Sequence, residues 1–149
     1  MSDQNITYID GTGLVLGRLG SYLAKKLLAG DKVVVVNAQD LLITGKRSSL
    51  IKDYQQRRDR ATHTNPRKGP FFPRFPDRIL RRTVRGMLPW KRSSGRQAFR
   101  RLSAYINIPD NLKEKEFTSI DVAAPKSLKA YMTVGELSKK IGWTHEERM

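Results

Sequence analysis

The sequence contains no cysteine among its 149 residues, which excludes disulfides, thiolate metal sites and cysteine nucleophiles. Histidine is scarce as well. His63 and His145 lie far apart in polar segments, without a clustered acid or a second ligand, so we expect no metal or catalytic role for either. The acids Asp110, Glu114 and Glu116 are spaced as in a solvated loop rather than as an acid-base pair. The residues therefore indicate a protein that is not an enzyme.

Long apolar runs are also missing. The longest candidates, residues 33–36 and 41–43, are far shorter than the roughly 20 residues of a membrane span. The N-terminal residues MSDQN have neither the basic region nor the apolar stretch of a secretory signal. We therefore expect a cytoplasmic protein that does not enter a membrane. At this length, a single domain covering residues 1–149 is expected.

Positive charge is concentrated in one part of the chain, residues 46–101, called the basic block below. The block holds 18 of the 29 lysines and arginines but only 3 of the 14 acids, so it carries the whole net charge of +15. Fourteen of the 18 are arginine, whereas nine of the 11 basic residues elsewhere are lysine. Arginine binds phosphate in a bidentate way and stacks on bases, while lysine is a solvated point charge. The block therefore predicts a polyanion-binding surface, with a solvated face that has no partner as the weaker alternative.

The apolar pattern predicts an α/β fold. A short strand at residues 8–10, an amphipathic helix with leucines from Leu16 to Leu27, and a β-branched strand at 33–36 form a βαβ unit. We expect further strands at residues 105–108 and, at the sheet edge, 117–122. Three further helices are expected around residues 50–54, at 98–102 and after a capping box at 133–136, with Ser48 or Ser49 capping the first of them.

The stretch 77–101 contains the densest group of arginines. Its first part, residues 77–88, places Leu80, Val84 and Met87 at helical spacing, with arginines between them. Asp77 is the expected N-cap, and Pro89 ends the helix near Leu88. Such a helix has an apolar face toward the core and a cationic face toward solvent.

Upstream of this helix, residues 61–76 contain four prolines and three phenylalanines together with arginine and lysine. Proline disfavours regular helix, and the segment has no apolar period. We assign it no secondary structure and interpret it as an extension that becomes ordered on a partner.

Aromatic residues are interspersed among the cations of the basic block: Tyr54, Phe71, Phe72, Phe75 and Trp90. Cations for phosphates and flat rings for unstacked bases are what single-stranded or looped RNA requires. Ordinary core packing is the alternative for these aromatic rings. A DNA-coating protein is the alternative for the arginines, which are too numerous to be buried beside so few acids.

Two glycine motifs invite comparison with nucleotide-binding loops, which would make the chain an α/β enzyme. Gly11-x-Gly13-x-x-x-Gly17 lies between a strand and a helix, but its spacing differs by one from a dinucleotide-binding turn, and a tight turn with close helix-strand packing explains it better. The segment 45–48 resembles the end of a P-loop, but Arg47 stands where serine or threonine would bind magnesium. We reject a P-loop.

Several motifs resemble one known family. VRGMLPWKRSSGR at residues 84–96, GLVLGRL at 13–19, VVVVNAQDLLITGK at 33–46, and the closing GEL and IGW at 135–137 and 141–143 are similar to those of large-subunit ribosomal protein thirteen. The similarity covers nearly the whole chain. The archaeal and eukaryotic branch is resembled more than the bacterial one, and an archaeal member is favoured.

This resemblance implies a three-layer α/β/α sandwich with a small, mostly parallel sheet of about four strands, plus basic extended loops. It implies a structural constituent of the large ribosomal subunit that binds rRNA and contacts neighbouring ribosomal proteins, without catalysis, cofactor, metal or small-molecule substrate. The family signature falls on residues 85–89. Together, the basic block and the resemblance predict RNA contacts at Lys46, Arg47, Arg57, Arg58, Arg60, Arg67, Lys68, Arg74, Arg78, Arg81, Arg82, Arg85, Trp90, Lys91, Arg92 and Arg96.

Overall fold

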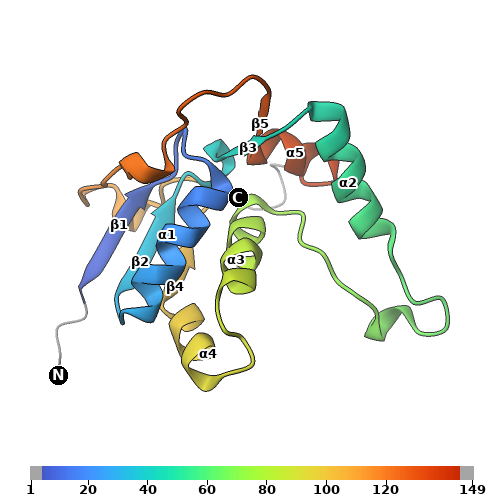
Figure 1. Ribbon diagram of the computed structural model, residues 1–149, viewed down its shortest axis with the longest axis horizontal. Coiled ribbons are helices and arrows are strands. Elements are labelled where there is room, and N and C mark those ends of the chain that lie inside the picture. Colours follow the sequence, from blue (N-terminus) through green and yellow to red (C-terminus); the bar gives the residue numbers. More distant parts are fainter. Residues whose placement is uncertain (1–4, 145–149) are drawn as a thin grey trace.

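The computed structural model describes residues 5–144 and confirms an α/β fold with a small, mostly parallel sheet. Helices and strands alternate along the first half of the chain, and helices dominate the middle (Figure 1). The strands are β1 (Ile6–Asp10), β2 (Lys32–Val36), β3 (Leu42–Thr44), β4 (Leu102–Ala104) and β5 (Tyr131–Thr133). The α-helices are α1 (Leu16–Leu28), α2 (Arg47–Asp59), α3 (Pro76–Met87), α4 (Ser93–Arg100) and α5 (Val134–Lys140).

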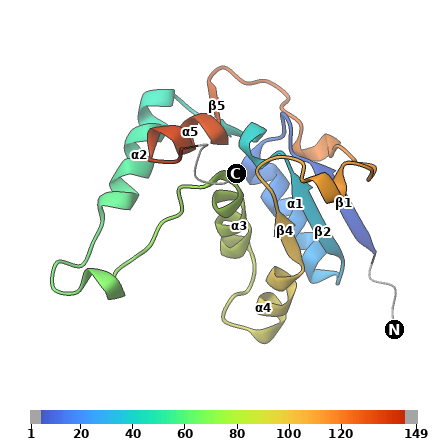
Figure 2. The same ribbon diagram turned by 180° about the vertical axis from the view of Figure 1, so that it is seen from behind.

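The main sheet contains β1, β2 and β4 in that order, all parallel. The central strand β2 is buried on both faces, since Val33, Val35 and Val36 are fully buried and Val34 is 7% exposed. Helix α1 covers one face: it lies in front of the strands in Figure 1 and behind them in Figure 2. The predicted βαβ unit is therefore present, and the unbroken valine run correctly indicated a strand buried on both sides.

The third parallel strand is displaced from its predicted position at residues 105–108. Helix α4 ends where the amide of Arg101 donates to the carbonyl of Ala98, and the Arg101 carbonyl then accepts from the amide of Val33, which begins the ladder. Helix α4 therefore ends at Arg100, two residues before the end of the helix predicted at 98–102, and Leu102 belongs to β4. Beyond Tyr105, whose amide donates to Val35, the chain leaves the sheet.

The edge strand predicted at 117–122 is wrong. Thr118 makes one parallel bridge to Ile9, with hydrogen bonds to Tyr8 and Asp10, and no strand extends from it. A single helical turn at Asp121–Ala123 follows, and the Ala123 carbonyl accepts from the amide of Val15 at the start of α1. The chain is thus turned away from the sheet edge after one bridge. A second sheet, the antiparallel pair β3 and β5, has no counterpart among the predictions.

Helix boundaries agree with the expected chemistry in part. Of the capping box predicted at 133–136, the N-cap half is confirmed, because Thr133 Oγ1 accepts a hydrogen bond from the Glu136 amide at 3.2 Å, whereas the Glu136 carboxylate pairs with Arg47. The N-cap of α3 is Phe75 rather than Asp77, since Pro76 occupies the first helical position, where its missing N–H costs nothing. Likewise, α2 begins after Lys46 and not after either serine.

Thr133→Ala is expected to lower the free energy of unfolding by about 1 kcal/mol, because the Glu136 amide loses the Thr133 hydroxyl oxygen as its acceptor at the helix end. Denaturation in urea measures the change. Ser48→Ala is the matched control: Ser48 is exposed in the first turn of α2, so its replacement is expected to change stability by less than about 0.5 kcal/mol. Equal losses in both variants would contradict the cap assignment.

Within residues 5–144, none of the helices is both long enough and apolar enough to cross a bilayer.

Candidate nucleic-acid interface

Helix α3 presents a row of arginines. Arg78, Arg81, Arg82 and Arg85 are spaced so that they share one face of the helix. Ile79, Leu80 and Val84 on another face are buried in the hydrophobic core. The predicted division of this helix into an apolar inner face and a cationic outer face is therefore confirmed for Leu80 and Val84, but it is wrong for Met87, which is 42% exposed at the helix end.

Each of these four guanidinium groups lies over an aromatic ring. The distance from the guanidinium carbon to the ring centroid is 5.4 Å for Arg78 over Phe75 and 4.9 Å for Arg81 over Phe99. It is 4.6 Å for Arg82 over Phe72 and 4.4 Å for Arg85 over Trp90. The rings come from three separate segments: the proline-rich stretch, the turn after α3, and α4.

The contact between each guanidinium group and its ring affects how both could contribute to RNA binding. A guanidinium that lies over a ring is held by the cation-π attraction, and those of its N–H groups that are exposed and make no other bond stay available for a phosphate. Arg82 already donates from Nη1 to the Phe71 carbonyl. Part of the entropy that a free arginine would lose on binding is then already lost in the folded protein. Phe72, Phe75 and Trp90, which the sequence predicted as surfaces for bases, therefore also serve as supports for arginines.

Arginine side chains from α2 and α3 hold the proline-rich segment by donating hydrogen bonds to its carbonyl groups. Arg82 Nη1 donates to the Phe71 carbonyl at 2.9 Å, and Arg58 Nη1 donates to the Phe72 carbonyl at 3.1 Å. Residues 61–68 differ, because all of them are exposed and their regular structure is one helical turn at Pro66–Lys68. Ordering of this loop by a partner stays a prediction.

The turn between α3 and α4 is tightly built. The amide of Arg92 donates to the Pro89 carbonyl at 3.0 Å, and Arg96 Nε donates to the Trp90 carbonyl at 3.1 Å. Gly95 packs directly against the Pro89 backbone. Trp90 is thereby held with its ring edge-on to Phe99, at a centroid distance of 5.2 Å.

The other predicted contact residues are spread over several regions. Arg57 lies over the Tyr54 ring at 5.0 Å, and Arg74 over Phe75 at 5.7 Å. Arg47 is turned toward α5, where its Nη1 is 3.0 Å from Glu136 Oε2. The remaining predicted residues are exposed on the loop after α2, at the start of α2, or in the turn before α4: Lys46, Arg60, Arg67, Lys68, Lys91 and Arg92.

Two residues have roles that the sequence did not indicate. Phe99, which the sequence only placed in a helix at 98–102, supports Arg81 with its ring. Arg101, the last cation of the basic block, donates from Nη2 to the Leu27 carbonyl at 2.6 Å and so caps the end of α1. Both contacts join different helices, so no local sequence signal could have identified them.

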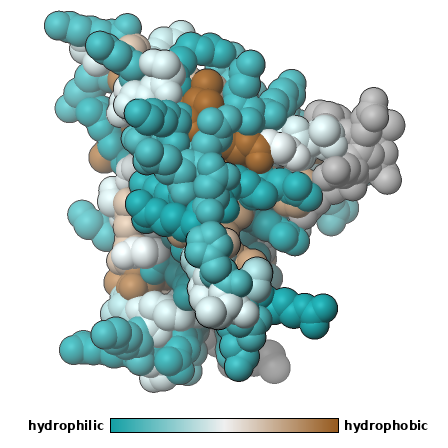
Figure 3. Space-filling model, turned by 90° about the vertical axis from the view of Figure 1, so that its right-hand side faces the viewer, coloured by the Kyte–Doolittle hydropathy of each residue, from teal (hydrophilic) through white to brown (hydrophobic). Residues whose placement is uncertain are grey.

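Several hollows open beside the arginine row, and two of them adjoin each other at Phe72, Pro73 and Arg82. A groove of about 500 Å³ lies between the proline-rich segment and α4, and is lined by Phe71, Phe72, Pro73, Arg78, Arg81, Arg82, Arg85, Trp90 and Phe99. A smaller hollow of about 240 Å³ lies toward α2 and shares Phe72, Pro73 and Arg82 with the groove. Neither lining includes an acidic residue. The surface on the α2 side is largely hydrophilic with small apolar areas (Figure 3).

The Asp10 carboxylate accepts the hydrogen bonds at the glycine turn that follows β1. Asp10 Oδ1 accepts hydrogen bonds from the Thr12 amide at 3.0 Å, the Thr12 hydroxyl at 2.7 Å and Asn37 Nδ2 at 3.0 Å. Burial acts to raise the pKa of Asp10, but the hydrogen bonds from Asn37 and Thr12 outweigh it and hold that pKa below its usual range. A carboxylate at this point disfavours a pyrophosphate.

Gly11 supports the same conclusion. A Cβ at this position would lie 3.0 Å from the Val36 carbonyl oxygen, so the glycine permits close packing of the turn on β2. Nearby, burial and the charge of Asp10 raise the pKa of the Asp40 carboxyl. These observations favour the tight-turn interpretation over a nucleotide-binding loop.

Metal coordination finds no support in the part of the chain that the structure describes. Across residues 5–144 there is no group of three or more histidines or acids close enough to hold an ion. His63 is exposed, and His145 lies outside the described residues.

Comparison with known proteins identifies the family. Residues 4–111 match the family described as ribosomal protein L13. The chain belongs to this family. Its resemblance to the archaeal branch is borne out by curated relatives named large ribosomal subunit protein uL13, from Methanosphaera stadtmanae, Archaeoglobus fulgidus and Methanocaldococcus jannaschii. Their identities are 44% over 138 residues, 44% over 142 and 46% over 138.

The similarity spans nearly all of both partners. It covers 92% of this chain and 97% of the Methanosphaera protein, 93% and 89% for the Archaeoglobus protein, and 92% and 98% for the Methanocaldococcus protein. Because the family is one of ribosomal proteins, the interpretation of the chain as a non-enzyme is confirmed.

Proposed function

We propose that this protein is a structural constituent of the large ribosomal subunit and binds large-subunit rRNA through the basic block. Relatives of nearly equal length carry the name large ribosomal subunit protein. The observation that carries the RNA-binding part is the row of four arginines on α3, each supported by an aromatic ring, beside a groove whose lining has no acid.

Pre-positioned guanidinium groups suit the RNA backbone. Phosphates recur along a strand, and a fixed row of bidentate donors can engage several of them with little further ordering. The cations outside the block, mainly lysines, balance the acids there and add no net charge. The partners are therefore rRNA at the basic block and neighbouring ribosomal proteins elsewhere. In this proposal the chain acts as one domain, residues 1–149, on cytoplasmic ribosomes.

Replacing Arg78, Arg82 and Arg85 together by glutamine is expected to reduce the salt dependence of rRNA binding. Each phosphate contact contributes about 0.7 to 0.9 to the slope of log affinity against log salt concentration, so removing three contacts lowers the slope by about 2. Titration of a structured large-subunit rRNA fragment at several salt concentrations measures the slope. Duplex DNA of equal length, tested in parallel, is expected to bind more weakly.

The matched control removes three cations outside the basic block: Lys25, Lys139 and Lys140, all exposed, are replaced by glutamine. Both triple variants lose the same charge, so the control is expected to retain the wild-type slope. An unchanged slope in the α3 variant would exclude this helix from the interface. Sedimentation of tagged protein with large subunits is the expected result in cells, and its absence would contradict the ribosomal assignment.

A further inference from the structure

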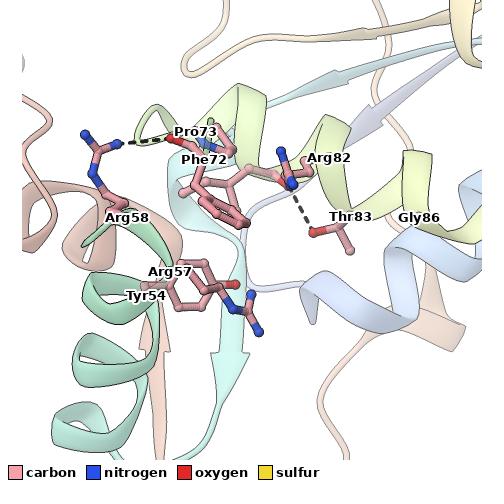
Figure 4. Close-up of a pocket in the computed structure, with 9 residues that line it drawn as sticks. Tyr54, Arg57, Arg58, Phe72, Pro73, Arg82, Thr83 and Gly86 are labelled. Carbon is pink, nitrogen blue, oxygen red and sulfur yellow. Dashed lines mark hydrogen bonds between the residues drawn. The ribbon is translucent and has the colours of Figure 1, made fainter. Parts of the chain in front are cut away.

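The smaller of the two hollows is formed by three segments that are distant in the sequence. Figure 4 shows Tyr54 and Arg57 from α2, Phe72 and Pro73 from the proline-rich segment, and Arg82, Thr83 and Gly86 from α3 around one space. Its volume is about 240 Å³. Pockets for drug-sized ligands span roughly 300–1,000 Å³, so this space suits one planar ring system better than a larger molecule.

Its interior is apolar and aromatic. Ile79, which is 3% exposed, lines it together with Thr83, whose hydroxyl donates to the Ile79 carbonyl at 2.9 Å. The rings of Tyr54 and Phe72 line the sides. At Gly86, no atom lies within 4 Å of where a Cβ would be, so the helix leaves open space beside the hollow.

The rim is cationic. Arg57 and Arg82 lie over the Tyr54 and Phe72 rings at 5.0 and 4.6 Å, and Arg58 is held by its bond to the Phe72 carbonyl. No acid lines the hollow. A neutral planar ligand has no negative charge for the three arginines to bind. An unstacked base can insert between apolar surfaces, and the phosphates on either side of its nucleotide can contact the arginines.

We propose that this hollow receives one unpaired base of the bound RNA, while the adjoining phosphates contact Arg57, Arg58 and Arg82. The inference rests on the proposed rRNA binding and adds that the RNA contains an unpaired nucleotide at this point. The larger groove shares Phe72, Pro73 and Arg82 with the hollow, so the strand continues from it along the α3 arginines.

The test compares two single-stranded RNA oligonucleotides of equal length and charge. One carries the fluorescent base 2-aminopurine at its centre and the other an abasic site there. Wild-type protein is expected to bind the first about tenfold more tightly, the factor that one stacked base supplies. Burial among aromatic and apolar side chains is also expected to change the 2-aminopurine fluorescence. Salt dependence is expected to be the same for both oligonucleotides.

Gly86→Leu is designed to fill the hollow without altering charge, and leucine is a better helix former than glycine. It is expected to abolish the tenfold preference while keeping the salt slope. Gly17→Leu is the matched control, because Gly17 is an exposed glycine of α1 that likewise has no atom within 4 Å of its Cβ position. This control is expected to keep the preference.

The outcomes separate the two proposals. Equal affinity of wild-type protein for the two oligonucleotides, with salt-dependent binding intact, overturns the base-binding hollow and leaves rRNA binding standing. Absence of salt-dependent binding to either oligonucleotide overturns the base-binding hollow, and it overturns rRNA binding as well only if the structured rRNA fragment also fails to bind. Retention of the preference in Gly86→Leu, or its loss in Gly17→Leu, also overturns the assignment to this hollow.

Discussion

Gly95→Ala is expected to lower the free energy of unfolding by about 3 kcal/mol, the upper part of the usual range for overpacking. Gly95 is buried in α4, and an added Cβ would meet the carbonyl carbon and oxygen of Pro89 well inside 3.0 Å. Those atoms are backbone, so they cannot turn aside as a flexible side chain could. The turn after α3 would have to move as a whole.

That movement also reaches the interface. The turn carries Trp90, whose ring supports Arg85 at 4.4 Å and whose carbonyl accepts from Arg96. Gly95→Ala protein that remains folded is therefore expected to bind rRNA more weakly than wild type. Urea denaturation measures the stability, and the salt titration described above measures the binding.

Alanine at two other helical glycines provides the control for Gly95→Ala, because the same methyl group is added in each case. Gly17 and Gly86 are exposed and have no atom within 4 Å of a Cβ position. Alanine there is expected to raise the free energy of unfolding by about 0.5 to 1 kcal/mol, since glycine is the poorer helix former. If Gly95→Ala were as stable as these variants, the close approach to Pro89 would be wrong.

Leu80→Ala is expected to cost about 3 kcal/mol, the middle of the range for truncating a fully buried leucine. Leu80 has no exposed surface and lies in the hydrophobic core on the inner face of α3. Because α3 packs against α1 and β4, the cavity would loosen the helix that carries the arginine row. Urea denaturation measures the loss.

Met87→Ala provides the comparison on the same helix. Met87 is 42% exposed, so truncating it is expected to cost less than about 1 kcal/mol. Its sulfur, together with the Thr83 methyl group, lies close to Gly20 of α1. Leu88, 6% exposed, is the member of the family signature that enters the core. Equal losses for Leu80 and Met87 would contradict this division of the helix.

Local patterns were sufficient for several elements. The period of apolar residues in α1 and α3, the valine run of β2 and the capping box at 133–136 each concern neighbours within one or two turns or one strand. Such interactions depend on residues a few positions apart, so the sequence displays them directly. The concentration of arginine in residues 46–101 is equally visible.

Other features depend on contacts between distant segments. The strands β3 and β5 have three residues each, and their pairing joins residue 42 to residue 133, so neither shows a period of its own. The position of β4 depends on where α4 ends and on its register with β2, and a strand of three residues has too short a hydrophobic pattern to specify that register by itself. The prediction of an edge strand at 117–122 was wrong because of another contact between distant segments. After the single bridge at Thr118, the chain turns so that the Ala123 carbonyl accepts from the Val15 amide at the start of α1.

For this protein, the sequence alone determined the α/β class, the cationic helix and the net charge of the basic block, because charge and helical period are properties of the chain itself. The sequence identified the arginines and the aromatic residues, but it could not show which arginine lies over which ring. Only the tertiary structure decided that Arg78, Arg81, Arg82 and Arg85 rest on Phe75, Phe99, Phe72 and Trp90. Those rings arrive from separate segments, and a cation-π contact of about 5 Å exists only after folding has brought the segments together.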